Sequence, residues 1–323
     1  MLSSVQPAVN ASTFLQYQTS QELLLLGLLS VGLSCSFLYV NSVLLFSLRS
    51  KPLFCETSRY ILLYNLLFAD TAQLLSSLLL FLLASLRVKL PYYACGALVL
   101  LSVATSTISP LTLAVMSVER FVAVCYPLRH AAVFTVRSTS VAIALVWAFS
   151  FVHILIRAFM LLYVFTTISP SVHMKDFCSK EAFFFASIFY DFEDVYAGTL
   201  FLLVGAAIVA SYVGVVLVAG SVHTDKASAR KALHTLLLHL IQLSLTLTST
   251  LFSTIIMAIG RTEGRLVLAR IYSVGFVCLN ILPRCLSALI YGLRDQSIRA
   301  VLMHNLCCLC RCSTPPNKSH FQM

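Results

Sequence analysis

The sequence has little charge: only 11% of its 323 residues are Asp, Glu, Lys or Arg, and 59% are hydrophobic. A typical soluble domain carries about 25% charged residues, so this chain lacks the polar surface that a soluble protein of its size needs. The high hydrophobic content also excludes a disordered chain. The net charge of +10 would suit a nucleic-acid-binding protein, but such a protein needs a denser basic surface. These observations indicate an integral membrane protein.

Several other features are missing. Residues 1–22 contain no Lys or Arg, so they lack the basic start of a cleaved signal peptide. The apolar segments show no inverted repeats and no rings of charge, which argues against a transporter or a channel. They also contain no nucleophile paired with a base and no metal-spaced cluster of His or Asp, so we expect neither an enzyme nor a metal or other cofactor.

Long apolar runs predict seven membrane-spanning helices. A helix needs about 20 mainly apolar residues to cross the hydrocarbon layer, and the runs are too long and too uniform for strands. The predicted helices are residues 23–48, 60–86, 93–124, 138–163, 195–222, 230–260 and 266–291. We therefore predict an all-α membrane protein, a seven-transmembrane helix bundle. A short amphipathic surface helix is expected at 292–306, before a cytoplasmic tail at 307–323.

Positive charge predicts the orientation. If the N-terminal segment 1–22 is extracellular, the inner segments hold 13 Lys and Arg residues and the outer segments hold seven. Cytoplasmic loops carry the excess of Lys and Arg, so the N-terminus is expected outside and the C-terminus inside a plasma-membrane protein. A glycosylation sequon at Asn10 suits this orientation, although such triplets also arise by chance.

Two of the 11 cysteines, Cys95 and Cys178, fall on the predicted outer, oxidising side. We expect them to form a disulfide between the third helix and the loop after the fourth; two unrelated free thiols are the alternative. The cysteines of the tail are reduced juxtamembrane candidates for palmitoylation: Cys307, Cys308, Cys310 and Cys312. Their spacing is tighter than that of the usual zinc-binding pairs, which makes a zinc site the less favoured alternative.

A motif at the end of the third predicted helix is more specific. Residues 116–130 read MSVERFVAVCYPLRH, with Glu119 and Arg120 at the acidic–Arg positions. This resembles the motif of rhodopsin-like G-protein-coupled receptors, and its extension is similar to the odorant-receptor branch. Further matches lie along the chain: Asn41, Leu66 to Asp70, Trp147, Ser211-Tyr212, Lys231 to Thr235, His239-Leu240 and Leu289 to Asp295.

The chain also departs from the odorant-receptor pattern. Cys178 is the lone cysteine of the second outer loop, where odorant receptors commonly have more. Ser287-Ala288 replaces the usual Asn-Pro of the seventh helix, although Pro283 could kink that helix earlier. Leu247 stands at the aromatic switch position of the sixth helix. The chain looks most similar to divergent receptors of the fish type.

The resemblance implies an activation site at the inner membrane edge. Glu119 would hold Arg120 in the inactive state and release it when the sixth helix swings away, with Tyr212 and Tyr291 as polar supports. The partners would be a small odorant, membrane lipid and a heterotrimeric G protein, of the olfactory Gs type. An ordinary helix-end ion pair is the alternative for Glu119 and Arg120. A non-olfactory receptor for a small metabolite is the alternative function.

The ligand should bind in the outer half of the bundle. The expected contacts are hydroxyls, an amide and apolar groups that suit a small, mostly apolar molecule: Ser102, Val103, Ser106, Thr107, Tyr196, Thr250, Thr254 and Asn280. The alternative for each Ser and Thr is a bond to its own helix. The outer half of the third helix has no acidic residue, which disfavours a binding site for primary amines built around an Asp there. Asp191, Glu193 and Asp194 are interpreted as a solvated loop, and attraction of cations to the mouth of the fifth helix is the alternative.

Charges inside the membrane are costly and usually paired. Asp70, Ser109, Arg284 and Ser287 are expected to form an intramembrane polar core. Arg284 either pairs with Asp70, taking the place of the sodium ion that the family commonly holds there, or snorkels to the inner surface. Arg157, one turn from His153, is interpreted as an anchor at the outer interface.

Overall fold

A computed structural model of the chain describes residues 6–86, 88, 90–168, 178, 180–184, 187–219, 227, 230–231, 233–241, 243–245, 271, 274–282, 284 and 298–299. The predictions for Thr250, Thr254, Ser287, Tyr291 and the four tail cysteines lie outside these residues. So do those for Leu247, Pro283 and most of the surface helix and tail.

The regular elements of the described chain are helical, which confirms the all-α prediction. In chain order they are α1 (Gln6–Ser50), α2 (Pro52–Glu56), α3 (Ser58–Ser85), α4 (Tyr92–Cys125), α5 (Pro127–Val133), α6 (Val136–Ile168), α7 (Lys180–Phe183), α8 (Ser187–Ala219) and the π-helix η1 (Phe276–Ile281). Pro52 and Pro127 start the short helices α2 and α5, because proline suits the first turn, where its missing N–H is not needed.

Five of these helices contain segments long and apolar enough to cross a membrane: Gly27–Ser50, Ser58–Ser85, Tyr92–Cys125, Val136–Thr167 and Asp191–Val218. A shorter apolar helix covers Leu233–Leu245. Large apolar side chains on the outer faces, such as Leu145, Phe159 and Leu202, are exposed in the absence of lipid. A soluble protein would bury such residues, so their exposure fits a bundle that lipid surrounds.

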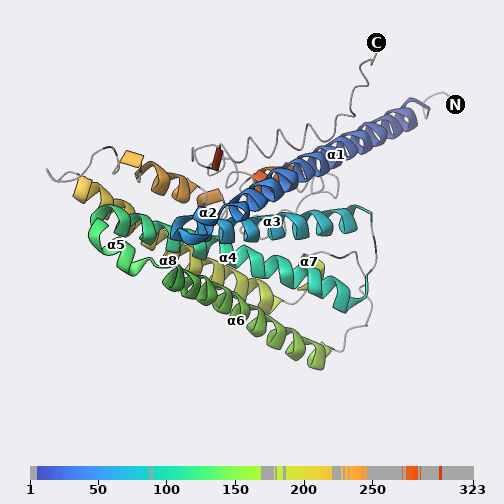
Figure 1. Cartoon of the computed structure of the whole chain (residues 1–323). Coiled ribbons are helices and arrows are strands. Elements are labelled where there is room, and N and C mark those ends of the chain that lie inside the picture. The colour runs from blue at the N-terminus through green and yellow to red at the C-terminus, as the bar shows by residue number, and fades with distance from the viewer. Residues whose placement is uncertain are drawn as a thin grey trace, which may run out of the picture.

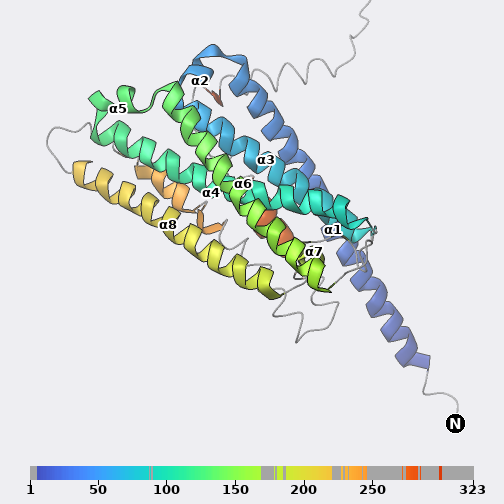
Figure 2. The same cartoon turned by 90° about the horizontal axis from the view of Figure 1, so that it is seen from below.

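Helix α4 is the central element. In the most apolar stretch of α4, 56% of the residues are buried, against 22% in that of α6. Figures 1 and 2 show α3, α6 and α8 beside α4, while the N-terminal part of α1 extends beyond the bundle. The largest apolar core joins α1, α3, α4 and α8 through fully buried residues that include Leu44, Leu66, Leu113 and Ile208.

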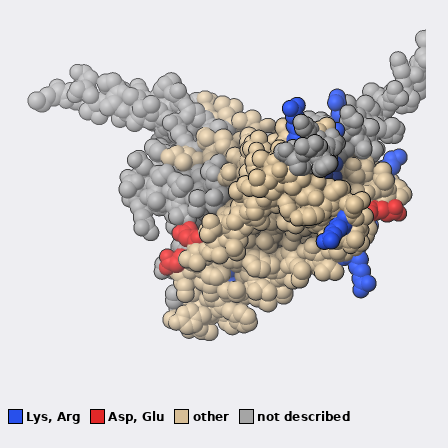
Figure 3. Space-filling view, turned by 90° about the vertical axis from the view of Figure 1, so that its left-hand side faces the viewer, with Lys and Arg blue, Asp and Glu red and all other residues tan. Residues whose placement is uncertain are grey.

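The bundle has two different ends. We call one of them the basic end. It contains the end of α1 and the short helix α5, and its exposed basic residues are Arg49, Lys51, Arg129 and Arg137. At the disulfide end, α4 begins and the Cys95–Cys178 bond lies. Figure 3 shows most Lys and Arg side chains of its face toward one side of the molecule, with a wide uncharged surface beside them.

Helix α8 begins at Ser187, whereas the sequence predicted the fifth span to begin at 195. The prediction excluded charged residues from the span. In the structure, Glu193 lies within the helix, and its charge is compensated by Arg157 of α6 and Lys180 of α7. The acidic stretch is therefore not simply a solvated loop, and its middle residue belongs to the disulfide-end site.

Candidate functional site

The disulfide end is closed by covalent and aromatic contacts. Cys95 of α4 is bonded to Cys178, as the sequence predicted, and both residues are fully buried. The Tyr92 hydroxyl donates a 2.6 Å hydrogen bond to the carbonyl oxygen of Phe183, and the two rings stack with centroids 4.6 Å apart. These contacts hold α7 and Cys178 against the start of α4.

Helix α4 presents its predicted ligand-binding residues beside α3 and α6. Ser102 accepts a hydrogen bond from Gln73 Nε2 of α3 at 3.2 Å, whereas Ser106 donates to the Val103 carbonyl of its own helix at 2.8 Å. Thr107 is buried and lies 3.4 Å from His153 Nδ1 of α6. Ser106 therefore makes only the helix-internal bond among its described contacts, and Ser102 connects α4 to α3. Thr107 does both, because its hydroxyl also donates to the Val103 carbonyl of its own helix at 3.3 Å.

Tyr196 of α8 reaches the same region. Its ring stacks on the His153 ring with centroids 3.7 Å apart and an interplanar angle of 8°. His153 therefore lies between a predicted ligand residue of α4, Thr107, and one of α8, Tyr196. Asn280 is within η1, and the described structure does not extend to its side chain.

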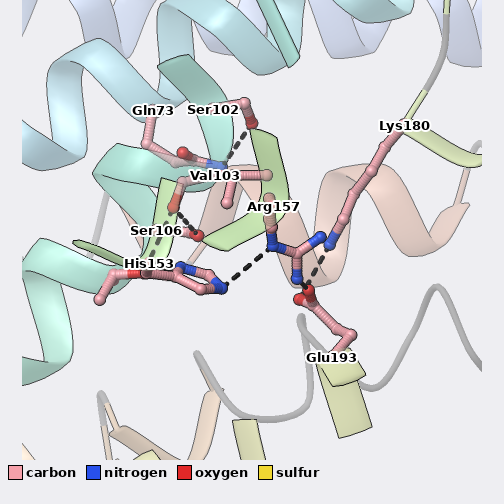
Figure 4. A network of polar contacts seen from close by, with 9 residues as sticks. Gln73, Ser102, Val103, Ser106, His153, Arg157, Lys180 and Glu193 are labelled. Atoms are coloured by element: carbon pink, nitrogen blue, oxygen red, sulfur yellow. Dashed lines mark hydrogen bonds and ion pairs between the residues drawn. The ribbon is translucent and has the colours of Figure 1, made fainter. Parts of the chain in front are cut away.

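Arg157 forms the centre of a charged cluster that the sequence did not predict (Figure 4). Its side chain is only 1% exposed, and it contacts the Glu193 carboxylate of α8 in an ion pair. Glu193 Oε1 also lies 3.0 Å from Lys180 Nζ of α7. The guanidinium lies over the rings of Phe184 and Phe192, at 5.0 and 5.5 Å from their centroids.

The interpretation of Arg157 as an interface anchor is therefore wrong. A snorkelling arginine keeps its head in water, but this one is turned into the protein, where a carboxylate and two aromatic rings replace water. The spacing of His153 and Arg157, one helical turn apart, was the available signal. It showed that both side chains share a face of α6, but it did not show which way that face points.

The hydrogen bonds fix the state of the His153 ring. Arg157 Nε donates to His153 Nε2 at 3.0 Å, so Nε2 is an acceptor and carries no hydrogen. The neutral ring must then carry its hydrogen on Nδ1, which donates to Thr107 Oγ1. A chain of polar contacts thus runs from Lys180 and Glu193 through Arg157 and His153 to α4.

Midway along the bundle, a second polar group joins α3, α4 and α6. The Ser109 hydroxyl donates to the Asp70 carboxylate at 2.6 Å, and both residues are buried. Asn65 donates to Thr112 and accepts from Trp147 Nε1, each at 2.9 Å. Arg284 is also buried, which does not fit a side chain that snorkels to the inner surface.

At the basic end, Glu119 binds two partners. Its Oε2 lies 3.1 Å from Arg120 Nε, and its Oε1 lies 3.2 Å from His130 Nε2 of α5. The Glu119 side chain is 4% exposed, whereas those of Arg120 and His130 are 18% and 28% exposed. This arrangement is more than an isolated surface ion pair, because a buried carboxylate joins the end of α4 to the following helix.

Tyr212 of α8 lies in an apolar cluster with Phe121, the residue that follows Arg120 in α4. The cluster joins α4, α8 and the helical segment around Leu236, through Val215 and Leu236 with Phe121, Val124, Cys125, Tyr212 and Leu233 packed against them. Three helices therefore meet by side-chain packing around the last turns of α4, beginning with Phe121. Such packing can come apart as a unit if one helix moves away.

The chain also matches a known family of receptors. Residues 40–291 match the seven-transmembrane receptors of the rhodopsin family. The chain belongs to this family. It is also similar to the zebrafish (Danio rerio) protein Odorant receptor 131-2, with 28% identity over 274 residues, 84% of this chain and 82% of the relative.

Membership gives the chain its general role. Rhodopsin-family receptors are multi-pass membrane receptors, not enzymes, and they couple small-molecule ligands to G proteins. The buried network at the disulfide end and the Glu119–Arg120 pair at the basic end are joined by α4, which contributes residues to both.

Proposed function

We propose that this chain is a chemosensory receptor that binds an odorant near the disulfide end and activates an olfactory Gs-type G protein at the basic end. The observation that carries the proposal is the Glu119–Arg120 pair at the end of α4. The sequence around this pair has the odorant-receptor pattern, and the similar zebrafish protein is named an odorant receptor.

The ligand would act by changing a population. The inactive state keeps Glu119 on Arg120 and His130, while Tyr212 packs near the segment around Leu236. An odorant that binds the active arrangement more tightly shifts the equilibrium toward it. Movement of that segment away from α4 would then expose Arg120 to the G protein.

The proposed ligand contacts are the predicted residues Ser102, Val103, Ser106, Thr107, Tyr196, Thr250, Thr254 and Asn280. The position of His153 between Thr107 and Tyr196 supports a common site for the α4 and α8 members of this set. Tyr291 is proposed to support Arg120 in the active state.

We place the disulfide end outside the cell and the basic end in the cytoplasm of a plasma-membrane protein. The exposed basic residues at one end and the disulfide at the other support this orientation. Asn10 would then be glycosylated, and Cys307, Cys308, Cys310 and Cys312 would be open to palmitoylation, adding a lipid anchor.

Cyclic AMP in transfected cells tests the function. Cells that express the receptor with an olfactory Gs-type α-subunit are exposed to waterborne amino acids, bile acids, amines, carboxylic acids and small alcohols. We expect at least one class to raise cyclic AMP, and Arg120→Ala to abolish the response at equal surface expression. Arg137→Ala removes an exposed arginine from α6 and should respond as the wild type does. A response that survives Arg120→Ala would contradict the proposal.

A further inference from the structure

The charged cluster of Arg157, Glu193 and Lys180 has one buried side and one open side. The exposed fraction of the side chains falls from 34% for Lys180 to 17% for Glu193 and 1% for Arg157. Lys180 is therefore the member of the cluster that solvent reaches most easily, and Arg157 is the one it reaches least. We call these three residues the charged cluster.

Arg157 depends on the Glu193 carboxylate more than Glu193 depends on Arg157. A buried guanidinium that loses its counter-ion is strongly destabilising, because no water replaces the lost partner. Glu193 has a second cationic partner, Lys180, at 3.0 Å and on the open side. Glu193 can thus turn away from Arg157 and keep a favourable partner, provided that another anion takes its place.

We propose that the charged cluster is a recognition site for the carboxylate group of a small ligand, and that Glu193 occupies this site when no ligand is bound. This inference deepens the proposed function and depends on it for the link to signalling. The ligand carboxylate would bind Arg157 through paired N–H···O bonds, the geometry that the planar guanidinium favours.

Because Arg157 depends on the Glu193 carboxylate, a positively charged ligand is excluded from this site. An amine would have to take Glu193 for itself, which would leave Arg157 buried without its carboxylate. A neutral alcohol would compete poorly with the existing ion pair, because it brings no charge to replace that of Glu193. Of the three ligand types, the carboxylate alone leaves both Arg157 and Glu193 with charged partners.

Aromatic residues beside the charged cluster offer apolar contacts for the rest of such a ligand. Phe184 and Phe192 flank the Arg157 guanidinium, and Phe192 also lies near His153 and Tyr196, with ring centroids 5.7 and 5.9 Å apart. A short hydrocarbon chain attached to the carboxylate would contact these rings. A change at Arg157 would also affect Thr107 of α4, because His153 is hydrogen-bonded to both Arg157 and Thr107.

Thermal unfolding of the purified full-length receptor in nanodiscs tests the inference without a G protein. The probes are sodium hexanoate, hexylamine and 1-hexanol, followed by carboxylates of four to eight carbons. We expect hexanoate to raise the unfolding temperature at concentrations where the amine and the alcohol have no effect. Arg157→Gln should weaken this stabilisation at least about tenfold in hexanoate concentration, since a charged hydrogen-bonded pair is lost.

Two further variants distinguish recognition from a folding defect. Glu193→Gln removes the competing carboxylate, so hexanoate should act at about tenfold lower concentration. Arg157→Lys keeps the charge without the planar fork and should give an intermediate effect. The matched controls, Arg137→Gln on α6 and Asp191→Asn on α8, remove exposed charges near the same helices and should match the wild type.

The inference is overturned if hexylamine stabilises the receptor more than hexanoate does, or if Arg157→Gln leaves the hexanoate effect unchanged. It is also overturned if none of the carboxylates of four to eight carbons binds. Arg120→Ala separates this failure from failure of the proposed function. Hexanoate should still stabilise Arg120→Ala, although signalling is lost. Binding that depends on Arg157 without any signalling would refute the proposed function alone. Signalling that depends on Arg120 without carboxylate binding would refute the inference alone.

Discussion

The two ends of α4 hold their charges in different ways. At the disulfide end, the charged cluster draws Arg157 from α6, Glu193 from α8 and Lys180 from α7. At the basic end, the described partners of Glu119 are its neighbour Arg120 and His130, 11 residues away. The first arrangement exists only when distant helices are assembled, whereas the second is largely local to α4 and α5.

This difference suits a receptor whose ends have different tasks. A ligand that changes the disulfide-end cluster acts on three elements at once, and it can therefore change how the helices fit together. At the basic end, Tyr212 of α8 and Leu233 both pack against the apolar cluster of Val215 and Leu236, and a moving helix can break such packing without separating charges. The comparison predicts that disruption should cost most stability at the disulfide end and most signalling control at the basic end.

The largest expected effect on stability is loss of the disulfide. Cys95→Ser or Cys178→Ser releases a link across 83 residues and leaves the aromatic cluster around Phe183 unsupported. We expect a loss of about 2–4 kcal/mol, measured by thermal unfolding, together with reduced surface expression. Cys35→Ser, an exposed free thiol on α1, is the control. Equal stability of the Cys95 and Cys35 variants would contradict this role.

A matched pair of glycines compares the two ends directly. A Cβ on Gly96 would lie 2.8 Å from the buried Phe183 ring, and a Cβ on Gly214 would meet the Phe121 ring. Gly96→Ala should cost about 1–3 kcal/mol, because Phe183 is 1% exposed and enclosed by other rings. Gly214→Ala should cost less, because Phe121 is only partly buried and can give way.

Gly198→Ala provides the control for both, since nothing lies within 4 Å of its added Cβ. Its unfolding temperature should be no lower than that of the wild type, because alanine suits a helix interior better than glycine does. A greater loss of stability in Gly214→Ala than in Gly96→Ala would reverse the comparison between the ends.

The smallest expected effect concerns the polar group between the ends. We propose that Arg284 pairs with Asp70 and takes the place of a sodium ion, a proposal that the burial of both side chains supports. Exchange of potassium for sodium should then leave wild-type unfolding unchanged. Arg284→Gln should gain a sodium-dependent rise of about 2–4 °C, which corresponds to about 1 kcal/mol. Sodium stabilisation of the wild type that Arg284→Gln leaves unaltered would refute the pairing.

The fold was predictable because each membrane helix can be recognised from its own stretch of sequence. About 20 apolar residues in a row are sufficient to predict a span, and the motif around Glu119 and Arg120 identifies the family. The pairing of Cys95 with Cys178 followed from their being the two cysteines on the predicted outer side. Each of these predictions needed only a count or a short pattern.

The charged cluster was not predictable in the same way. Arg157, Lys180 and Glu193 are widely separated in the sequence, and each taken alone fits an exposed residue near the membrane surface. Their pairing depends on how α6 and α8 are rotated and on where α7 is held by the disulfide. The π-helix η1 was missed for a related reason, because the sequence pattern of Phe276–Ile281 does not differ visibly from that of an α-helix.

The most direct test of the account is the basal activity of Glu119→Gln in the absence of any ligand. If Glu119 restrains Arg120, this variant should raise basal cyclic AMP about fivefold at equal surface expression, the low end of allosteric coupling energies. The double variant Glu119→Gln/Arg120→Ala should return to background, because the released arginine is what the G protein uses. Basal activity of Glu119→Gln equal to that of the wild type, or a rise that survives the loss of Arg120, would contradict the account.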